Sequence, residues 1–225
     1  MTNLHSFRKQ TFWDFFDTEA APNLRYREVT FRKIFDYLDT KNKPILIVET
    51  GCARIPNNWA GDGQSTVLFD KYVSNRDAES ICYSVDISQS SVENCRNLVS
   101  NRVTVSQDDS VHYLQNLAKK INSEGRYIDL LYLDSFDLDF IYWQPSAIHH
   151  LKELCAAMKC IDKNTLVVVD DSPPNADFIW SDEKSITFIN TPIIGGKGRM
   201  VAEFAQATGA QLYFSGHYQA GWTGF

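Results

Sequence analysis

The sequence predicts an α/β fold in which helices cover both faces of a mostly parallel sheet. Five apolar segments of strand length show no alternation with polar residues, and segments with helical character separate them. Strands of this kind are buried on both faces, which is typical of parallel sheets. The predicted strands lie in residues 44–51, 80–88, 102–110, 127–135 and 164–172, and the predicted helices in residues 66–73, 89–100, 110–121 and 146–160.

The two ends of the chain complete this architecture. A helix in residues 197–209 precedes two short strands in residues 210–225, which we expect to form an antiparallel hairpin around Ser215–Gly216. With the five parallel strands, this gives a seven-stranded, doubly wound sheet of the Rossmann-like kind. The segment 1–42 is predicted to be a helical cap on a single domain formed by residues 43–225.

Aromatic residues crowd the cap segment. Its helix, in residues 25–40, places five apolar side chains at approximately helical spacing: Val29, Phe31, Ile34, Phe35 and Leu38. Such a stripe indicates core packing of the helix. An aromatic lid over a ligand is the alternative.

Composition narrows the classes of function. The chain has 225 residues and a formal net charge of −6, so it lacks the basic excess that a nucleic-acid partner would need. Its five cysteines form no C-x-x-C pair, which argues against a zinc site and favours reduced, mostly buried thiols. No signal sequence or membrane-spanning segment is recognisable, so we expect a cytoplasmic protein without a membrane partner. A homo-oligomer is left open.

Acidic residues stand at the end of every predicted strand. In an open parallel sheet, ligands bind outside the carboxyl ends of the strands. Five acidic strand ends therefore indicate that this edge, here called the acidic rim, is the functional site. The rim comprises Glu49, Asp86, Asp108, Asp109, Asp134, Asp170 and Asp171.

The first two rim segments suggest a ligand that carries a ribose. Gly51 follows the first strand, Gly63 precedes the next helix, and Ser65 is placed to cap that helix, whose N-terminus favours an anion. The spacing is not G-x-G-x-x-G, and a Walker A lysine is absent, so a plain flexible connection is the alternative for this loop. Asp86 follows the second strand, where an acid either binds ribose hydroxyls or caps the next helix.

The third rim segment, "QDDS", offers Asp109 and Ser110. A side chain at this point either reaches the amine of an adenine or caps the helix that follows.

The order of these motifs resembles the class I S-adenosylmethionine-dependent methyltransferases. The segments "VETG…GDGQST", "SVDIS", "VSQDDS", "LLYLDS" and "VVVDDS" carry the resemblance, which covers about residues 25–225. It is strongest to the metal-dependent O-methyltransferases of the macrocin and catechol types. The resemblance implies that S-adenosylmethionine is bound by Glu49, Gly51, Gly63, Ser65, Asp86, Asp109, Ser110 and Asp134. It also implies a Mg²⁺ ion on Asp134, Asp170 and Asp171.

The adjacent pair Asp170–Asp171 is the most unusual feature of the rim. Two carboxylates at the end of a buried strand repel each other and lose hydration. A Mg²⁺ ion, which prefers carboxylate and water oxygens, would remove this conflict. The alternative is that both side chains point into water or cap the turn before Pro173.

The sequence departs from the family pattern in two places. Residues 54–60 form an insertion in the first loop, and the segment after Asp134 lacks the lysine of catechol-type enzymes. Asp137, three residues beyond Asp134, is then the candidate general base, with His217 a weaker one. His149 and His150 stand in mid-helix, which favours a surface or packing role.

The function that these features predict is Mg²⁺-assisted O-methylation of a small molecule with a hydroxyl group, such as a sugar, a glycoside or a catechol. Asp134 and Asp137 are the expected catalytic residues. Two alternatives remain: a metal-independent methyltransferase of the same fold, and a nucleotide-binding α/β protein that is not a methyltransferase.

Overall fold

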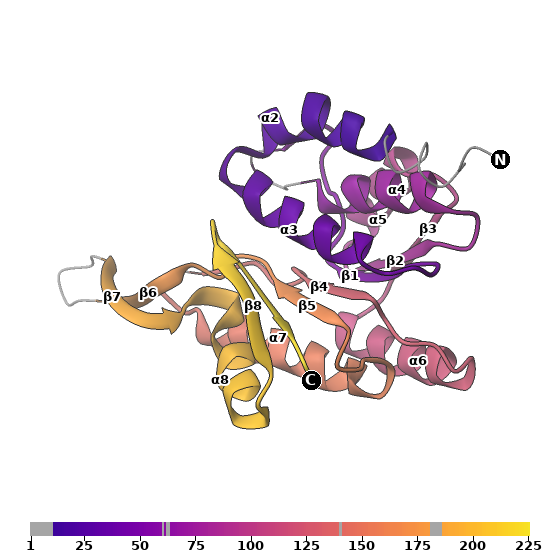
Figure 1. Cartoon of the computed structure of the whole chain (residues 1–225). Helices are drawn as coiled ribbons and strands as arrows, with labels where there is room; N and C mark the ends of the chain where they lie inside the picture. Colours follow the sequence, from indigo (N-terminus) through magenta and orange to yellow (C-terminus); the bar gives the residue numbers. More distant parts are fainter. Residues whose placement is uncertain (1–10, 60, 62–63, 140, 181–185) are drawn as a thin grey trace. The chain divides into compact units, whose positions relative to one another are not determined.

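A computed structural model describes residues 11–59, 61, 64–139, 141–180 and 186–225 of the chain (Figure 1). It confirms the predicted α/β class. Seven strands form one sheet in the order β3-β2-β1-β4-β5-β9-β8. The pairs β1–β2, β2–β3 and β4–β5 are parallel, whereas β5–β9 and β8–β9 are antiparallel. The predicted order of five parallel strands followed by a terminal hairpin is therefore correct.

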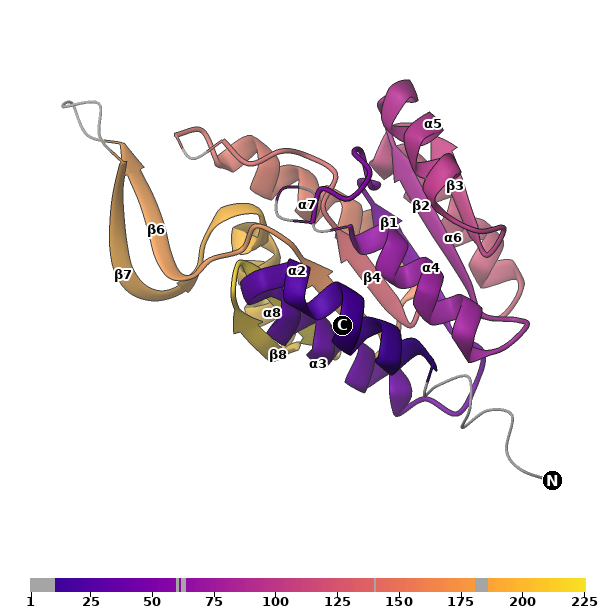
Figure 2. The ribbon, with the colours of Figure 1, turned by 90° about the horizontal axis from the view of Figure 1, so that it is seen from above.

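The chain divides into two compact units, residues 1–109 and residues 110–225. The expected division into a cap of residues 1–42 and a domain of residues 43–225 stays a prediction. The first unit contains η1 (Phe16–Ala20), α2 (Ala21–Leu24), η2 (Arg25–Arg27), α3 (Glu28–Asp39), β1 (Leu46–Thr50), α4 (Ser65–Arg76), β2 (Ile81–Asp86), α5 (Gln89–Leu98) and β3 (Val103–Gln107). Figure 2 shows α4 and α5 running beside these strands.

An aromatic cluster forms the core of the first unit. Phe35 packs against Phe12, Phe16, Phe31, Phe69 and Tyr72, with ring centroids 4.7–6.3 Å apart. These rings are buried, so the aromatic residues of α3 pack the core as the helical stripe indicated. Val29 is the exception, because it is 42% exposed while its neighbour Thr30 is buried.

The second unit begins with α6 (Ser110–Ser123) and contains two parallel strands, β4 (Leu130–Leu133) and β5 (Leu166–Val169). Between them lie α7 (Gln144–Ala157) and η3 (Met158–Cys160). The unit ends with η4 (Gly196–Gly198), α8 (Arg199–Thr208), β8 (Gln211–Gly216) and β9 (Gln219–Thr223). Figure 1 shows α8 beside β8.

The terminal hairpin turns two residues later than predicted. Its connecting residues are His217 and Tyr218, both with positive φ (49° and 68°). Positive φ at both central residues is the pattern of a type I′ turn, which matches the twist of the strands that it joins. The backbone amide of Ser172 donates to the carbonyl of Tyr218 at 2.7 Å, which ties this turn to the end of β5.

A second hairpin was not predicted. β6 (Pro174–Trp180) pairs with β7 (Ile186–Ile194) in a separate two-stranded antiparallel sheet, drawn as a twisted ribbon in Figure 1. In the described part of the chain, no helix is long and apolar enough to cross a membrane. The five cysteines are unpaired thiols, and only Cys155 is exposed, as the sequence indicated.

The aromatic cluster supplies a test of the first unit's packing. We expect Phe35→Ala to lower the free energy of unfolding by about 3–5 kcal/mol, because it leaves a cavity among buried rings. Tyr26→Ala removes a ring that is 76% exposed, and should change stability by no more than about 0.5 kcal/mol. Urea unfolding of both variants measures the difference. Equal stabilities would contradict the described core.

Candidate active site

In the first unit, Glu49 is the centre of a cage of hydroxyl groups at the end of β1. Its carboxylate is fully buried. It accepts hydrogen bonds from Ser65 Oγ at 2.5 Å, Thr66 Oγ1 at 2.7 Å and Ser84 Oγ at 2.6 Å. Burial raises the pKa of Glu49 to about 7, although the three hydroxyl groups act in the opposite direction. Glu49 therefore joins the first turn of α4 and strand β2 to β1.

The turn after β1 is held against the end of β2. Gly51 adopts a φ of 80° and donates its amide to the carbonyl of Val85 at 2.8 Å. The half-buried carboxylate of Asp86 accepts the backbone amides of Cys52 at 3.3 Å and Ser88 at 2.8 Å. The N-cap of α5 is Ser88, whose hydroxyl accepts the amide of Ser91, so Asp86 does not cap that helix.

The loop between β1 and α4 makes internal polar contacts. Gln64 has a φ of 52° and donates its side-chain amide to the carbonyl of Ile55 at 2.8 Å. Asn94 on α5 donates to the carbonyl of Arg54 at 3.1 Å, so this contact attaches the insertion to the helix that follows β2. Ser65 is the first residue of α4, and its hydroxyl is engaged by Glu49. Gly63 lies outside the described residues.

The third rim segment straddles the boundary of the two units. In the first unit, the backbone amide of Asp109 donates to the carboxylate of Asp108 at 2.8 Å. In the second unit, Ser110 is the first residue of α6, and its hydroxyl lies 2.9 Å from His149 Nε2 and 3.5 Å from Ser135 Oγ.

In the second unit, three predicted metal ligands lie at two paired strand ends. Leu133 of β4 pairs with Val169 of β5, so Asp134 and Asp170 follow directly at the same edge. We call Asp134, Asp170 and Asp171 the rim triad. Asp171 has a φ of 45°, a left-handed conformation that few residues other than glycine adopt. The sharp turn sends the two adjacent carboxylates to different partners.

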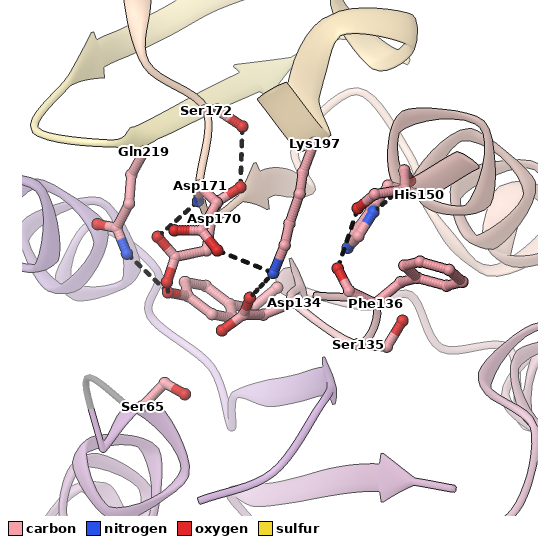
Figure 3. A network of polar contacts seen from close by, with 12 residues as sticks. Ser65, Asp134, Ser135, Phe136, His150, Asp170, Asp171, Ser172, Lys197 and Gln219 are labelled. Atoms are coloured by element: carbon pink, nitrogen blue, oxygen red, sulfur yellow. Dashed lines mark hydrogen bonds and ion pairs between the residues drawn. The ribbon is translucent and has the colours of Figure 1, made fainter. Parts of the chain in front are cut away.

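Asp170 is directed into the protein. It is buried, accepts the hydroxyl of Tyr132 at 3.0 Å, and accepts the backbone amide of Asp171 at 2.9 Å. Gln219 of β9 in turn donates to the Tyr132 hydroxyl at 2.6 Å, a contact visible beside Gln219 in Figure 3. Asp170 therefore belongs to a polar network beneath the rim.

Asp134 and Asp171 share one cation, the ammonium of Lys197. Lys197 Nζ lies 2.5 Å from Asp134 Oδ1 and 3.1 Å from Asp171 Oδ2 (Figure 3). Lys197 is only 1% exposed. Burial lowers the pKa of Lys197, but the carboxylates of Asp134 and Asp171 outweigh burial and raise the net pKa above its usual value. The lysine is therefore charged at neutral pH.

Two glycines bring Lys197 to this position. At Gly196, which has a φ of 59°, an added Cβ would overlap the carbonyl oxygen of Asp171, and at Gly198 it would overlap the hydroxyl of Ser172. The backbone amide of Lys197 donates to the same Asp171 carbonyl at 3.1 Å. The sequence "GGKG" thus permits a backbone approach that side chains would block.

The rim triad does not fit a Mg²⁺ ion as arranged here. An ammonium already bonds to two of its carboxylates, and the third is directed toward Tyr132. Among the residues that the structure describes, no group of three or more acidic, histidine or cysteine side chains is placed to hold a metal ion.

The candidate bases have different surroundings. Asp137 is exposed in the segment after β4, and His217 is exposed in the turn of the terminal hairpin. His150 is buried, and its Nδ1 lies 2.7 Å from the carbonyl of Ser146, so it packs inside the unit as expected. Burial lowers the pKa of His150 to about 4, which keeps its ring neutral.

His149 lies close to the end of β4, although its position in mid-helix suggested a place away from the strand ends. Its ring lies 5.4 Å from that of Phe136, just after β4, and it contacts Ser110 at the start of α6. Glu153, one helical turn further along α7, lies 3.4 Å from His149 Nε2 and accepts the hydroxyl of Ser135 at 2.5 Å. These contacts lower the pKa of the buried Glu153 despite the opposing effect of burial.

Sequence reasoning missed Lys197, which contacts two carboxylates of the rim, and Glu153, which contacts His149. A lysine flanked by glycines, "GGKG", was a usable signal for Lys197, because it marks a close backbone approach that carries a charge. The i, i+4 spacing of His149 and Glu153 was the signal for the second pair. Neither signal says which strand end the residues reach.

Comparisons with known proteins support the fold. The structure of a putative rRNA methylase from Clostridium thermocellum is similar, with a TM-score of 0.50 and 15% sequence identity, over 87% of this chain and 97% of that chain. The DhpI–SAH complex shows a TM-score of 0.48 and 10% identity, over 97% of this chain and 92% of that chain. No family model matches the sequence, and no curated protein does so significantly. At 15% identity, the likeness to the first of these two structures concerns the fold alone.

The Glu49 cage predicts a pH dependence of stability. The folded-state pKa of about 7 exceeds the unfolded value of 4.5, so the folded protein binds one more proton between these values. Stability should therefore fall as pH rises from about 4.5 to about 7, by an amount on the order of 3 kcal/mol. Glu49→Gln should remove this part of the slope. Urea unfolding of both proteins at pH 5, 6, 7 and 8 tests it, and parallel pH profiles would contradict the assignment.

Proposed function

We propose that this chain is an S-adenosylmethionine-dependent methyltransferase that acts on a hydroxyl group of a small molecule. The observation that carries the proposal is the arrangement at the ends of β1 and β2. A half-buried carboxylate, Asp86, is fixed beside the glycine turn at Gly51, and the turn, which follows β1, is hydrogen-bonded to the end of β2. The shared fold with a putative methylase and the order of the rim motifs support the same activity.

The residues of the first unit fit such a cofactor. A carboxylate at the end of the second strand can accept hydrogen bonds from the two hydroxyls of a ribose. Gly51 leaves room for a ligand to approach the backbone. Glu49 is enclosed by hydroxyl groups, so we assign it a positioning role: it holds the first turn of α4, including Ser65, at the end of β1. Asp109, Ser110 and Asp134 remain proposed cofactor contacts.

S-adenosylmethionine supplies a methyl group on a sulfonium, which is intrinsically reactive toward an oxygen nucleophile. The protein's contribution is to bind the acceptor, to remove its proton and to exclude water. We propose Asp134 as the proton acceptor, because its side chain is 23% exposed and Lys197 fixes its orientation. Asp137 is the second candidate, since it is exposed three residues further along.

The acceptor class rests on the charge of the rim. Asp134 and Asp171 present partly exposed carboxylates, which can accept hydrogen bonds from neighbouring hydroxyls of one molecule. A sugar, a glycoside or a catechol offers such hydroxyls. We therefore propose a neutral acceptor with adjacent hydroxyl groups. The net charge of −6 makes a nucleic acid an unfavourable partner.

Titration calorimetry with S-adenosylhomocysteine tests the cofactor. We expect binding by the wild-type chain and a 10- to 100-fold loss for Asp86→Asn, roughly the value of a hydrogen bond to a charged group. Asp36→Asn removes an exposed carboxylate from α3 of the same unit and should bind like the wild type.

Transfer of a labelled methyl group to catechols and to sugars with adjacent hydroxyls then identifies the acceptor class. Binding of a phosphorylated nucleotide together with no binding of S-adenosylhomocysteine would refute the proposal. That result would favour the nucleotide-binding alternative.

A further inference from the structure

We infer that the ammonium of Lys197 is the resident cation of the rim triad, in the place where the sequence predicted Mg²⁺. The triad therefore needs no divalent ion, and a latent metal site appears only when the lysine is removed. This inference about binding stands on the contacts of the second unit alone. Its consequence, methyl transfer that resists chelation, rests on the proposed function.

The carboxylates of the rim triad need a cation to balance their charge. Three carboxylates follow two adjacent strand ends, and like charges brought together in a partly desolvated place destabilise one another. A cation in their midst relieves this repulsion. Lys197 Nζ contacts Asp134 and Asp171 at hydrogen-bonding distance. Its positive charge thus neutralises carboxylate charge, as a divalent ion would.

Lys197 is held in place through both its backbone and its side chain. Its backbone amide donates to the Asp171 carbonyl, and Gly195 donates its own amide to the carbonyl of Pro173 at 2.9 Å. Its side chain is 2% exposed, compared with 23% for Asp134 and 30% for Asp171. The Lys197 side chain is thus more deeply buried than the two carboxylates that it contacts. A lysine that merely reached the rim from the surface would be exposed instead.

The direction of the Asp170 side chain also disfavours a metal ion. A Mg²⁺ ion on this triad would need that carboxylate to turn away from Tyr132. Tyr132 and Asp170 are both buried, so the rotation would break a hydrogen bond inside the protein. To bind all three carboxylates, a metal ion would have to displace the buried ammonium of Lys197 and also break the Tyr132–Asp170 hydrogen bond.

Manganese titration followed by electron paramagnetic resonance tests the inference, because bound Mn²⁺ loses the sharp signal of the free ion. We would compare the wild-type chain with Lys197→Met, which keeps the length of the side chain and removes its charge. Lys152→Met is the matched control, since it removes an exposed lysine from α7 of the same unit. The double variant Lys197→Met/Asp134→Asn removes the ammonium and one carboxylate together.

We expect no specific Mn²⁺ binding by the wild type or by Lys152→Met. Lys197→Met should bind Mn²⁺ at least ~10-fold more tightly than the weak, nonspecific binding of the wild type. The double variant should lose that gain in affinity. Wild-type binding that disappears in Asp171→Asn would overturn the inference, whether or not Lys197→Met folds. A folded Lys197→Met chain that gains no affinity would also overturn it, because the triad would then not be a latent metal site.

Cofactor binding separates this inference from the proposed function. S-adenosylhomocysteine binding that is unchanged by EDTA, together with the expected Mn²⁺ results, supports both. The expected Mn²⁺ results without any cofactor binding would leave the resident cation established and refute the methyltransferase alone.

Discussion

The site in the second unit depends on one interaction, the ion pair of Lys197 with Asp134 and Asp171. Parallel strands end at the same edge, so acidic residues that follow β4 and β5 come close together whatever their partners. Their mutual repulsion sets a requirement for a nearby cation. The glycines on either side of the lysine allow its backbone to approach closely enough to supply that cation. The left-handed turn at Asp171 separates the two adjacent carboxylates. Removing one member of a buried ion pair commonly destabilises a protein by about 3–5 kcal/mol.

The first unit meets a similar difficulty in a different way. Glu49 is also an acid at the end of a buried strand, but three hydroxyl groups donate to it, and no cation among the described residues forms an ion pair with it. Neutral donors compensate burial only in part, so the pKa rises to about 7. The two arrangements suit different tasks. Glu49 fixes the first turn of α4, whereas Lys197 holds the side-chain oxygens of Asp134 and Asp171 at the edge of the sheet.

Much of the fold was predictable because burial leaves a clear pattern. All five parallel strands and the helices between them lie where the apolar segments and their spacing indicated, and the terminal hairpin turns only two residues late. The β6–β7 ribbon was not predicted, since a two-stranded sheet after Pro173 lacks the uniformly apolar strands that marked the rest. Val29 shows the limit of approximate periodicity: an error of one position exchanges an exposed residue for a buried one.

Only the part of the candidate site that lies at the strand ends was predictable from the sequence. Acidic residues after consecutive strands locate the rim, but the sequence cannot say that a lysine 26 residues beyond Asp171 returns to it. That return depends on two close backbone contacts, at Gly196 and Gly198. His149 illustrates the same difficulty, because its position in mid-helix hides its contact with Ser110 at the start of another helix.

The central claim is that a built-in ammonium, and not a divalent ion, balances the carboxylates of the rim. The most direct measurement is a crystal structure of the wild-type chain grown in MnCl₂, with anomalous diffraction data to locate manganese. The account predicts no manganese peak at the rim, and electron density that joins the Lys197 amine to Asp134 and Asp171. A manganese ion bound by Asp134, Asp170 and Asp171, with Lys197 turned away, would contradict it.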